Sequence, residues 1–222
     1  MFKEDTFPPA PLPLKITFIA HSTLMLTWGD TVIHVDPVAE YADYSSLPKA
    51  GLVLVTHEHS DHLDPEAIAA VRTESTAIVV GPKCGSRVQG SIVLHNGDSR
   101  SVKGVRIEAV PAYNIVHVRS PGSPFHPKGD GNGYVMTLGA RKIYVAGDTE
   151  NTREMKGLKG IDIAFLPMNL PYTMTPEMVA DAVLAFRPKI LYPYHCGDTD
   201  TAALEKLMAS ARDVEVRFRG MK

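Results

Sequence analysis

Short apolar segments separated by polar turns dominate the chain and predict a fold rich in β-strands. Ile, Val, Leu and Phe recur in these segments, which are bounded by Gly, Pro, Asn or Asp. The expected strands cover residues 14–19, 23–28, 31–35, 51–55, 76–80, 92–94, 105–110, 133–138, 142–145, 161–166, 190–194 and 214–218. The first three follow one another through tight turns, so we expect an antiparallel meander at the start of the chain.

Helices are expected where capping residues precede apolar positions at helical spacing. Residues 64–66 (Asp-Pro-Glu) and 175–177 (Thr-Pro-Glu) each combine an N-cap, a proline at the first helical position and an acidic residue near the positive end of the helix dipole. The first helix should run through about Arg72, and a last helix should cover about 201–211. Strands and helices in this order predict an α/β fold.

A cluster of polar side chains follows the strand at 51–55. His57, His59, Asp61 and His62 form the pattern H-x-H-x-D-H. Residues two apart on an extended segment point the same way, so His57 and His59 can bind one ion while Asp61 and His62 face a second. Imidazole and carboxylate without thiolate suit zinc, iron or manganese in an open catalytic site. The alternative, a solvated loop with incidental histidines, does not explain four potential ligands so close together.

The H-x-H-x-D-H pattern resembles the metal motif of the metallo-β-lactamase fold superfamily, and the surrounding chain is similar to its UlaG-like branch of metal-dependent hydrolases. Three further features match in the expected order: Asp36 after a strand, Gly-Asp-Thr at 147–149 after a later strand, and His195 after a later one still. The resemblance implies a four-layer αββα sandwich of two mixed sheets with helices outside. We expect residues 1–222 to form a single hydrolase domain of this kind.

The resemblance also implies the roles of individual residues. Asp148 would bridge two ions, and His195 would complete the ligand set that Asp61 and His62 begin. Asp61, His62 and Asp148 are therefore the expected catalytic residues.

Two residues near the amino terminus are expected to support this site. By resemblance, Asp36 orients a ligand histidine and does not itself bind metal. His21 matches a family position beside the site and is expected in the same supporting layer. His34, on the neighbouring strand, is expected to be a packing residue.

The sequence departs from the family pattern at one point. A third ligand histidine is expected after the strand at 105–110, yet Asn114 stands there. Either Asn114 serves as a weaker amide ligand, or a histidine of the long Pro-, Gly- and Ser-rich segment 115–132 reaches in. His126 is favoured over His117, because the flanking proline and glycine give it a fixed turn. Long segments of this kind are typical of functional loops.

Composition narrows the possible partners. The 222 residues carry a net charge of -2 without a basic run, so no broad nucleic-acid or membrane footprint is expected. Cys84 and Cys196 are too few for a disulfide framework and are expected to be reduced thiols. The amino-terminal segment has no apolar run of signal-peptide length, so we expect a cytoplasmic protein. A small-molecule substrate is expected, and a homo-oligomer remains open.

The predicted activity is metal-assisted hydrolysis. One or two divalent ions, zinc first and manganese or iron as alternatives, would lower the pKa of water so that hydroxide attacks the substrate. Asp61 would orient this hydroxide and shuttle a proton. Lys128 or Arg119 on the long loop is expected to anchor an anionic substrate, and Asn114 is a further candidate for substrate binding.

The substrate class is open at this stage. A small ester, lactone or amide is the first hypothesis. The alternatives are a phosphodiesterase acting on a phospholipid or a nucleotide-derived substrate, and a non-hydrolytic metal-binding protein that kept the fold. The incomplete third ligand is the feature that favours the last alternative.

Overall fold

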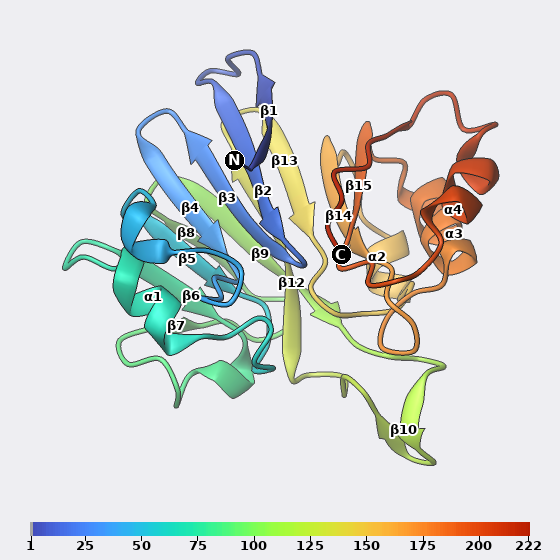
Figure 1. Ribbon diagram of the computed structural model, residues 1–222, viewed down its shortest axis with the longest axis horizontal. Helices are drawn as coiled ribbons and strands as arrows, with labels where there is room; N and C mark the ends of the chain where they lie inside the picture. The colour runs from blue at the N-terminus through green and yellow to red at the C-terminus, as the bar shows by residue number, and fades with distance from the viewer. Residues whose placement is uncertain (1) are drawn as a thin grey trace.

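Two seven-stranded mixed sheets pack face to face, and helices cover their outer faces (Figure 1). The computed structural model describes residues 2–222. The first sheet follows chain order and comprises β1 (Lys3–Phe7), β2 (Leu14–Ala20), β3 (Thr23–Trp28), β4 (Thr31–Val35), β5 (Leu52–Val55), β6 (Ala77–Val80) and β7 (Ile92–Val93). The second sheet has the order β16 (Glu215–Val216), β15 (Ile190–Tyr194), β14 (Ile163–Pro167), β13 (Arg141–Val145), β12 (Gly131–Leu138), β9 (Val105–Ala112) and β8 (Ser99–Val102).

The remaining elements lie outside these sheets. They are the α-helices α1 (Pro65–Val71), α2 (Arg153–Lys156), α3 (Pro176–Phe186) and α4 (Thr201–Met208), the 3₁₀ turns η1 (Tyr44–Ser46) and η2 (Pro82–Cys84), and the hairpin strands β10 (Val118–Ser120) and β11 (Ser123–Pro124). No helix within residues 2–222 is long and apolar enough to cross a membrane. The α1 helix covers the first sheet, whereas α3 and α4 cover the second (Figure 1).

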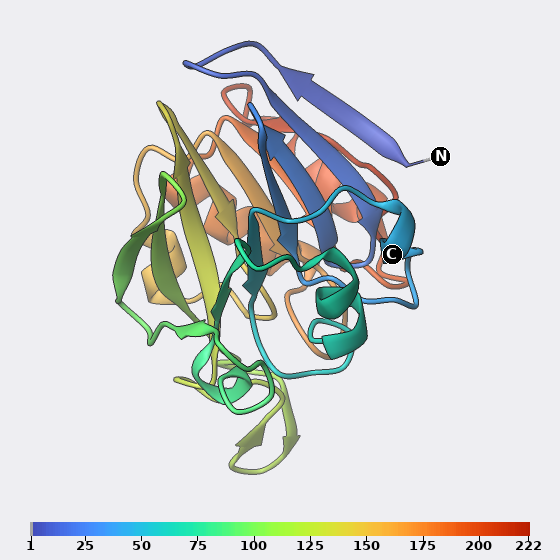
Figure 2. The same ribbon diagram turned by 90° about the vertical axis from the view of Figure 1, so that its left-hand side faces the viewer.

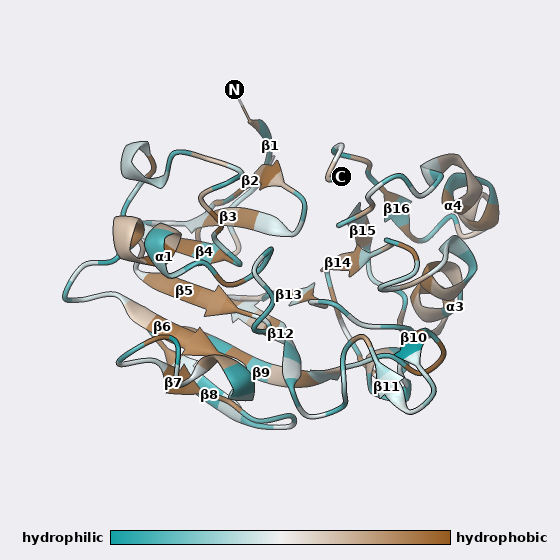
Figure 3. Ribbon diagram, turned by 60° about the horizontal axis from the view of Figure 1, so that its bottom comes forward, coloured by the Kyte–Doolittle hydropathy of each residue, from teal (hydrophilic) through white to brown (hydrophobic). Residues whose placement is uncertain are grey.

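Apolar side chains fill the space between the sheets and beneath the helices. Strand β5 illustrates why the sequence produces this arrangement: Leu52 and Leu54 point into the core between the sheets, and Val53 and Val55 point toward α1. A strand buried on both faces reads as a continuous apolar run, which is the pattern seen at this segment. Figure 3 shows the same hydrophobic character in β5, β6 and β14. The predicted αββα sandwich is confirmed.

The capping residues identified in the sequence begin the two main helices. Asp64 accepts a hydrogen bond from the Glu66 N–H at 2.8 Å, and Thr175 accepts one from the Met178 N–H at 3.2 Å. Both side chains satisfy backbone donors of the first helical turn.

Several short elements differ from the expectation. Strand β1 was not predicted, because it is an edge strand in which only Phe7 is buried, and it pairs antiparallel with β2. Strand β8 also escapes prediction, since three of its four residues are exposed. Near the carboxyl end, α4 stops at Met208 and β16 spans only Glu215–Val216, because it pairs with just the first two residues of β15.

The long segment 115–132 contains secondary structure that its composition did not predict. Strands β10 and β11 form a small hairpin that extends away from the two sheets (Figure 2). The chain then returns to the second sheet as β12, which pairs with β9 from Gly131 opposite Ala112. Residues on both sides of the hairpin therefore lie at the same edge of the sheet.

Candidate metal centre

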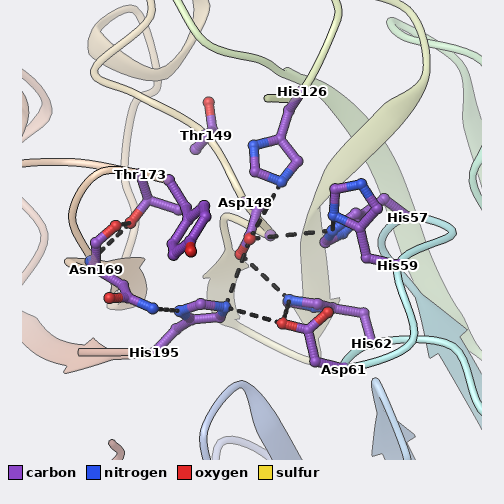
Figure 4. Close-up of polar contacts among 12 residues, drawn as sticks. His57, His59, Asp61, His62, His126, Asp148, Thr149, Asn169, Thr173 and His195 are labelled. Atoms are coloured by element: carbon purple, nitrogen blue, oxygen red, sulfur yellow. Dashed lines mark hydrogen bonds and ion pairs between the residues drawn. The ribbon is translucent and has the colours of Figure 1, made fainter. Parts of the chain in front are cut away.

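Strand ends from both sheets deliver the polar residues to one edge of the sandwich (Figure 4). His57 follows β5, Asp148 follows β13 and His195 follows β15. Strands β13, β14 and β15 run parallel in the second sheet, and β5 runs parallel to β6 in the first, so each sheet has these carboxyl ends at one edge. His126 arrives from the loop that returns to β12. Segments far apart in the sequence thus converge because the sheet topology aligns their ends.

Unusual backbone conformations place several of these side chains. His21, Asp36 and His195 have φ values of 53°, 45° and 47°, in the left-handed region that non-glycine residues rarely adopt. Gly147, with φ 64°, allows close approach as well: a Cβ there would lie 2.9 Å from the Thr56 Cβ. The glycine therefore lets Asp148 lie against the segment that carries the histidine motif.

Three histidines form the first group of potential ligands. Nitrogens of His57, His59 and His126 lie within 4.8 Å of one another, and His57 Nε2 is 3.1 Å from His59 Nδ1. Burial, followed by repulsion from His62, holds the pKa of His57 well below its usual value. Burial likewise lowers the pKa of His59. Neutral imidazoles whose nitrogens face one another offer lone pairs to a cation.

The second group combines three histidines with a carboxylate: His21, Asp61, His62 and His195. The Asp61 Oδ2 atom lies 3.2 Å from His21 Nε2 and 3.5 Å from His195 Nε2. Burial disfavours the Asp61 carboxylate, but the close contact with His195 and the hydrogen bond from His21 outweigh it and hold its pKa below the usual value. His21 was expected only in a supporting role, and the structure places its ring directly among the potential ligands.

Asp148 lies between the two groups (Figure 4). Its Oδ1 atom is 3.3 Å from His62 Nε2, and its Oδ2 atom is 3.3 Å from His126 Nε2 and 3.5 Å from His195 Nε2. Burial opposes its ionisation, yet the positive charge available at His195 and His62 holds its pKa well below the usual value. A carboxylate that contacts histidines of both groups is placed as a bridging ligand would be.

Three buried polar atoms at this site make no hydrogen bond with any of residues 2–222. They are His62 Nε2, His195 Nε2 and Asp148 Oδ1. Buried polar atoms are nearly always paired, since an unpaired one costs about 1–3 kcal/mol. All three atoms are suitable metal ligands, so the donor set fits a divalent ion.

Polar residues around the site contact the Nδ1 atoms of three of these histidines. His62 Nδ1 donates to Asp36 Oδ2 at 2.8 Å, and Asp36 also accepts from the Thr56 N–H at 2.8 Å. His126 Nδ1 lies 2.8 Å from Asn114 Oδ1. The Asn169 amide lies 3.3 Å from His195 Nδ1. Such contacts fix the orientation of ligand histidines.

A hollow of about 390 Å³ opens beside these groups. Asp61, Asp148, His126 and His195 line its base, and Arg119 contributes a positive charge from the hairpin. The Arg119 guanidinium lies 5.0 Å from the centre of the Phe125 ring, so a cation–π contact supports it.

Comparison with known proteins agrees with this geometry. A family model described as the beta-lactamase superfamily domain matches residues 15–195. The chain belongs to the metallo-β-lactamase superfamily. A metal-dependent hydrolase of Pelotomaculum thermopropionicum is 30% identical over 92% of this chain and 96% of its own. One from Thermus thermophilus is 31% identical over 82% and 83% of the respective chains.

Two solved structures have the same fold. A candidate metal-dependent hydrolase from Parabacteroides distasonis has 46% identity and a TM-score of 0.95, with 100% of both chains covered. A metallo hydrolase from Ignicoccus hospitalis has a TM-score of 0.76 over 94% of this chain and 95% of its own, and at 23% identity it shows the fold alone.

The structure places Asn114 and Lys128 differently from the expected ligands. The Asn114 amide oxygen accepts from His126, and its amide nitrogen donates to Glu150 and to the Tyr172 carbonyl. The ammonium of Lys128 pairs with Glu154 at 2.6 Å, and Lys128 is not among the residues that line the hollow.

Other predictions agree with the packing. His34 is buried and lies 3.0 Å from the Pro48 carbonyl oxygen, away from the superfamily motif. Cys196 packs in the core beneath the helices, where burial raises the pKa of its thiol to about 12. His195 has a left-handed backbone conformation, and its side chain lies at the metal centre while that of Cys196 lies in the core.

Glu150 and Asn169 contact the candidate ligands or the loop that carries them, and neither residue was predicted. Glu150 is buried, and burial disfavours its charge, but hydrogen bonds from His117, Asn114 and Val116 outweigh this cost and hold its pKa below the usual value. Both residues contact partners more than twenty positions away. A buried carboxylate immediately after the superfamily's Gly-Asp-Thr segment is the one signal available in the sequence.

Proposed function

We propose that this protein is a metal-dependent hydrolase that cleaves a small ester, lactone or amide carrying a negatively charged group. The observation that carries the proposal is that Asp148 contacts histidines of both ligand groups, through His62 and His126, beside a substrate-sized hollow. Relatives matched over most of their length are named metal-dependent hydrolases, which supports the reaction class.

The chain offers two places for a divalent ion on either side of Asp148. His57, His59 and His126 would hold one ion, while Asp61, His62 and His195 would hold the other, with His21 beside them. Zinc suits these nitrogen and oxygen donors best, and manganese or iron are the alternatives. When bound, such ions polarise a carbonyl group and bring the pKa of water toward neutrality.

Asp61 is the residue suited to orient the attacking water. Its side chain is 40% exposed and lines the hollow, and His21 fixes one of its oxygens at 3.2 Å. A carboxylate in this position accepts a hydrogen bond from the attacking water and sets its direction.

Arg119 is the residue suited to select the substrate. Its guanidinium is positioned at the hollow by Phe125, which in turn packs edge-on against Tyr172 with ring centres 5.1 Å apart. A guanidinium binds carboxylate or phosphate oxygens through two parallel hydrogen bonds. The substrate is therefore expected to carry such a group near the bond that is cleaved.

A panel of chromogenic esters tests the proposal. Metal-reconstituted protein should hydrolyse carboxylic esters, and esters with a second, free carboxylate should have the lower KM. Arg119→Ala should raise KM for the anionic esters by about tenfold to a hundredfold, the value of a charge-assisted hydrogen bond. It should leave neutral esters unchanged, and Lys128→Ala should change neither.

Two outcomes would contradict the proposal. Faster turnover of phosphate diesters than of any carboxylic ester would assign a phosphodiesterase. Full metal occupancy without turnover of either class would assign a non-hydrolytic metal-binding protein.

A further inference from the structure

A buried carboxylate organises the loop that leads to the metal centre. Glu150 has no exposed surface and lies two positions after Asp148. It belongs to none of the groups within residues 2–222 that could hold an ion. Its oxygens instead accept hydrogen bonds from segment 114–117: from the backbone N–H of Ile115 (2.6 Å), Val116 (2.6 Å) and His117 (2.8 Å), from His117 Nδ1 (2.7 Å) and from Asn114 Nδ2 (3.1 Å).

Asn114 connects this carboxylate to His126. The Asn114 backbone N–H donates to the His126 carbonyl at 2.9 Å, and the His126 N–H donates to Asn114 Oδ1 at 2.8 Å. Segment 114–126 is thus a loop whose two ends are bonded to each other. The same amide oxygen lies 2.8 Å from His126 Nδ1.

The acceptors around Asn114 determine which way its amide points. One end of the amide faces two acceptors, the Glu150 carboxylate and the Tyr172 carbonyl, so that end must be the NH₂ group. The other end is therefore the oxygen, which can only accept. His126 Nδ1 must then carry a proton, so Nε2, which lies 3.3 Å from Asp148 Oδ2, is the ring nitrogen that remains for an ion.

We propose that Glu150 is a positioning residue that sets the orientation and tautomer of His126 through Asn114. The inference rests on the proposed metal centre, in which His126 supplies the third histidine beside His57 and His59. It also explains the departure from the superfamily pattern: the asparagine at the expected histidine position holds the histidine that replaces it. The carboxylate that fixes this asparagine comes from the segment that provides Asp148.

Only a carboxylate satisfies all the donors that converge on position 150. Both oxygens of Glu150 accept, whereas a glutamine would bring its own NH₂ group against backbone N–H groups or the Asn114 NH₂. Glu150→Gln should therefore release the amide of Asn114 and let His126 adopt the other tautomer. Changes of this kind weaken metal binding by about tenfold to a hundredfold.

Zinc titration of chelator-stripped protein tests the inference. Wild type, Glu150→Gln, His126→Ala and the double variant are titrated in competition with a chromophoric chelator. Glu150→Gln should lower the affinity for one zinc ion by about tenfold to a hundredfold and leave the affinity for the other unchanged. In the His126→Ala background the same change should add less than about twofold, because both changes act on one ligand.

Two further variants separate positioning from loss of folding. Asn114→Ala should have the same zinc affinity as Glu150→Gln. If Glu150→Gln does not fold, the zinc affinity of Asn114→Ala tests the inference in its place. Glu154→Gln is the matched control, since this carboxylate lies on the same segment but pairs with Lys128. It should leave both zinc affinities unchanged. The ¹⁵N shifts should show a proton on His126 Nδ1 in wild type and its partial loss in Glu150→Gln.

The possible failures are distinguishable. Unchanged zinc affinity in both Glu150→Gln and Asn114→Ala would overturn the positioning role of Glu150 but not the metal centre. So would a double variant whose loss of zinc affinity equals the sum of the losses in Glu150→Gln and His126→Ala, expressed as free energies. Wild type that binds no zinc would overturn this role together with the metal centre. Wild type that binds zinc but hydrolyses no ester would remove the proposed activity and leave the role of Glu150 intact.

Discussion

Replacing Asp36 by asparagine should lower activity, because Asp36 orients a candidate ligand histidine. It is completely buried, and its two oxygens serve three donors at 2.8 Å each: the Thr56 N–H, the Thr56 hydroxyl and His62 Nδ1. Asp36→Asn keeps the size of the side chain and one acceptor oxygen. It replaces the oxygen that faces His62 with an NH₂ group.

The Asp36→Asn substitution should change the tautomer of His62. With a donor at position 36, His62 Nδ1 must become the acceptor, and the proton moves to Nε2, the atom that faces Asp148. A hydrogen bond to a charged group contributes about 1.5–3 kcal/mol, and about 1.4 kcal/mol corresponds to a factor of ten. We therefore expect kcat/KM to fall by about tenfold to a hundredfold while metal remains bound.

The assay compares kcat/KM and zinc content in wild type, Asp36→Asn and Asp43→Asn. Asp43 is a suitable control because its carboxylate is exposed and bonds only to Ser45, at the start of η1. A rate within twofold of wild type for Asp36→Asn would refute the orienting role. Complete loss of both ions would instead make Asp36 a direct ligand.

Three further predictions concern the centre and its surroundings. Asp148→Ala should abolish hydrolysis and weaken both ions, because the carboxylate contacts histidines of both groups; normal zinc content and rate would exclude the bridge. Cys196→Ala should keep activity within a few-fold, since the thiol packs in the core; a loss as large as that of His195→Ala would contradict this. Chelator treatment should remove activity and about one to two ions together, with recovery on adding zinc; activity that survives metal removal would contradict the proposed reaction.

The site residues that could be predicted are those that form a motif within a short stretch of sequence or match the family pattern. His57 and its neighbours lie within one short segment after a strand, so spacing alone indicated a metal motif. Asp148 and His195 were accessible only through the family resemblance, because each is isolated in the sequence. His126 was favoured for its rigid turn, and the structure places it beside His57 and His59.

The parts that were not predictable depend on contacts between distant segments. Glu150 accepts hydrogen bonds from a loop that begins thirty-six positions earlier in the chain. Neither periodicity nor local spacing in the sequence predicts such a contact. Asn114 was a candidate amide ligand or substrate contact because only its position was visible in the sequence, whereas the structure shows which groups surround its amide. In the fold, β1 and β8 lacked a hydrophobic pattern, and the two-residue turn Lys103-Gly104 that joins β8 to β9, with φ of 52° and 77°, was not predicted.

Anomalous diffraction at the zinc edge from crystals of the zinc-reconstituted protein tests the metal centre most directly. We expect a peak among His57, His59 and His126, with a His126 ring nitrogen within about 2.0–2.3 Å of the ion, and a second peak on the opposite side of Asp148. A His126 ring turned toward solvent with no ion beside it would contradict the account.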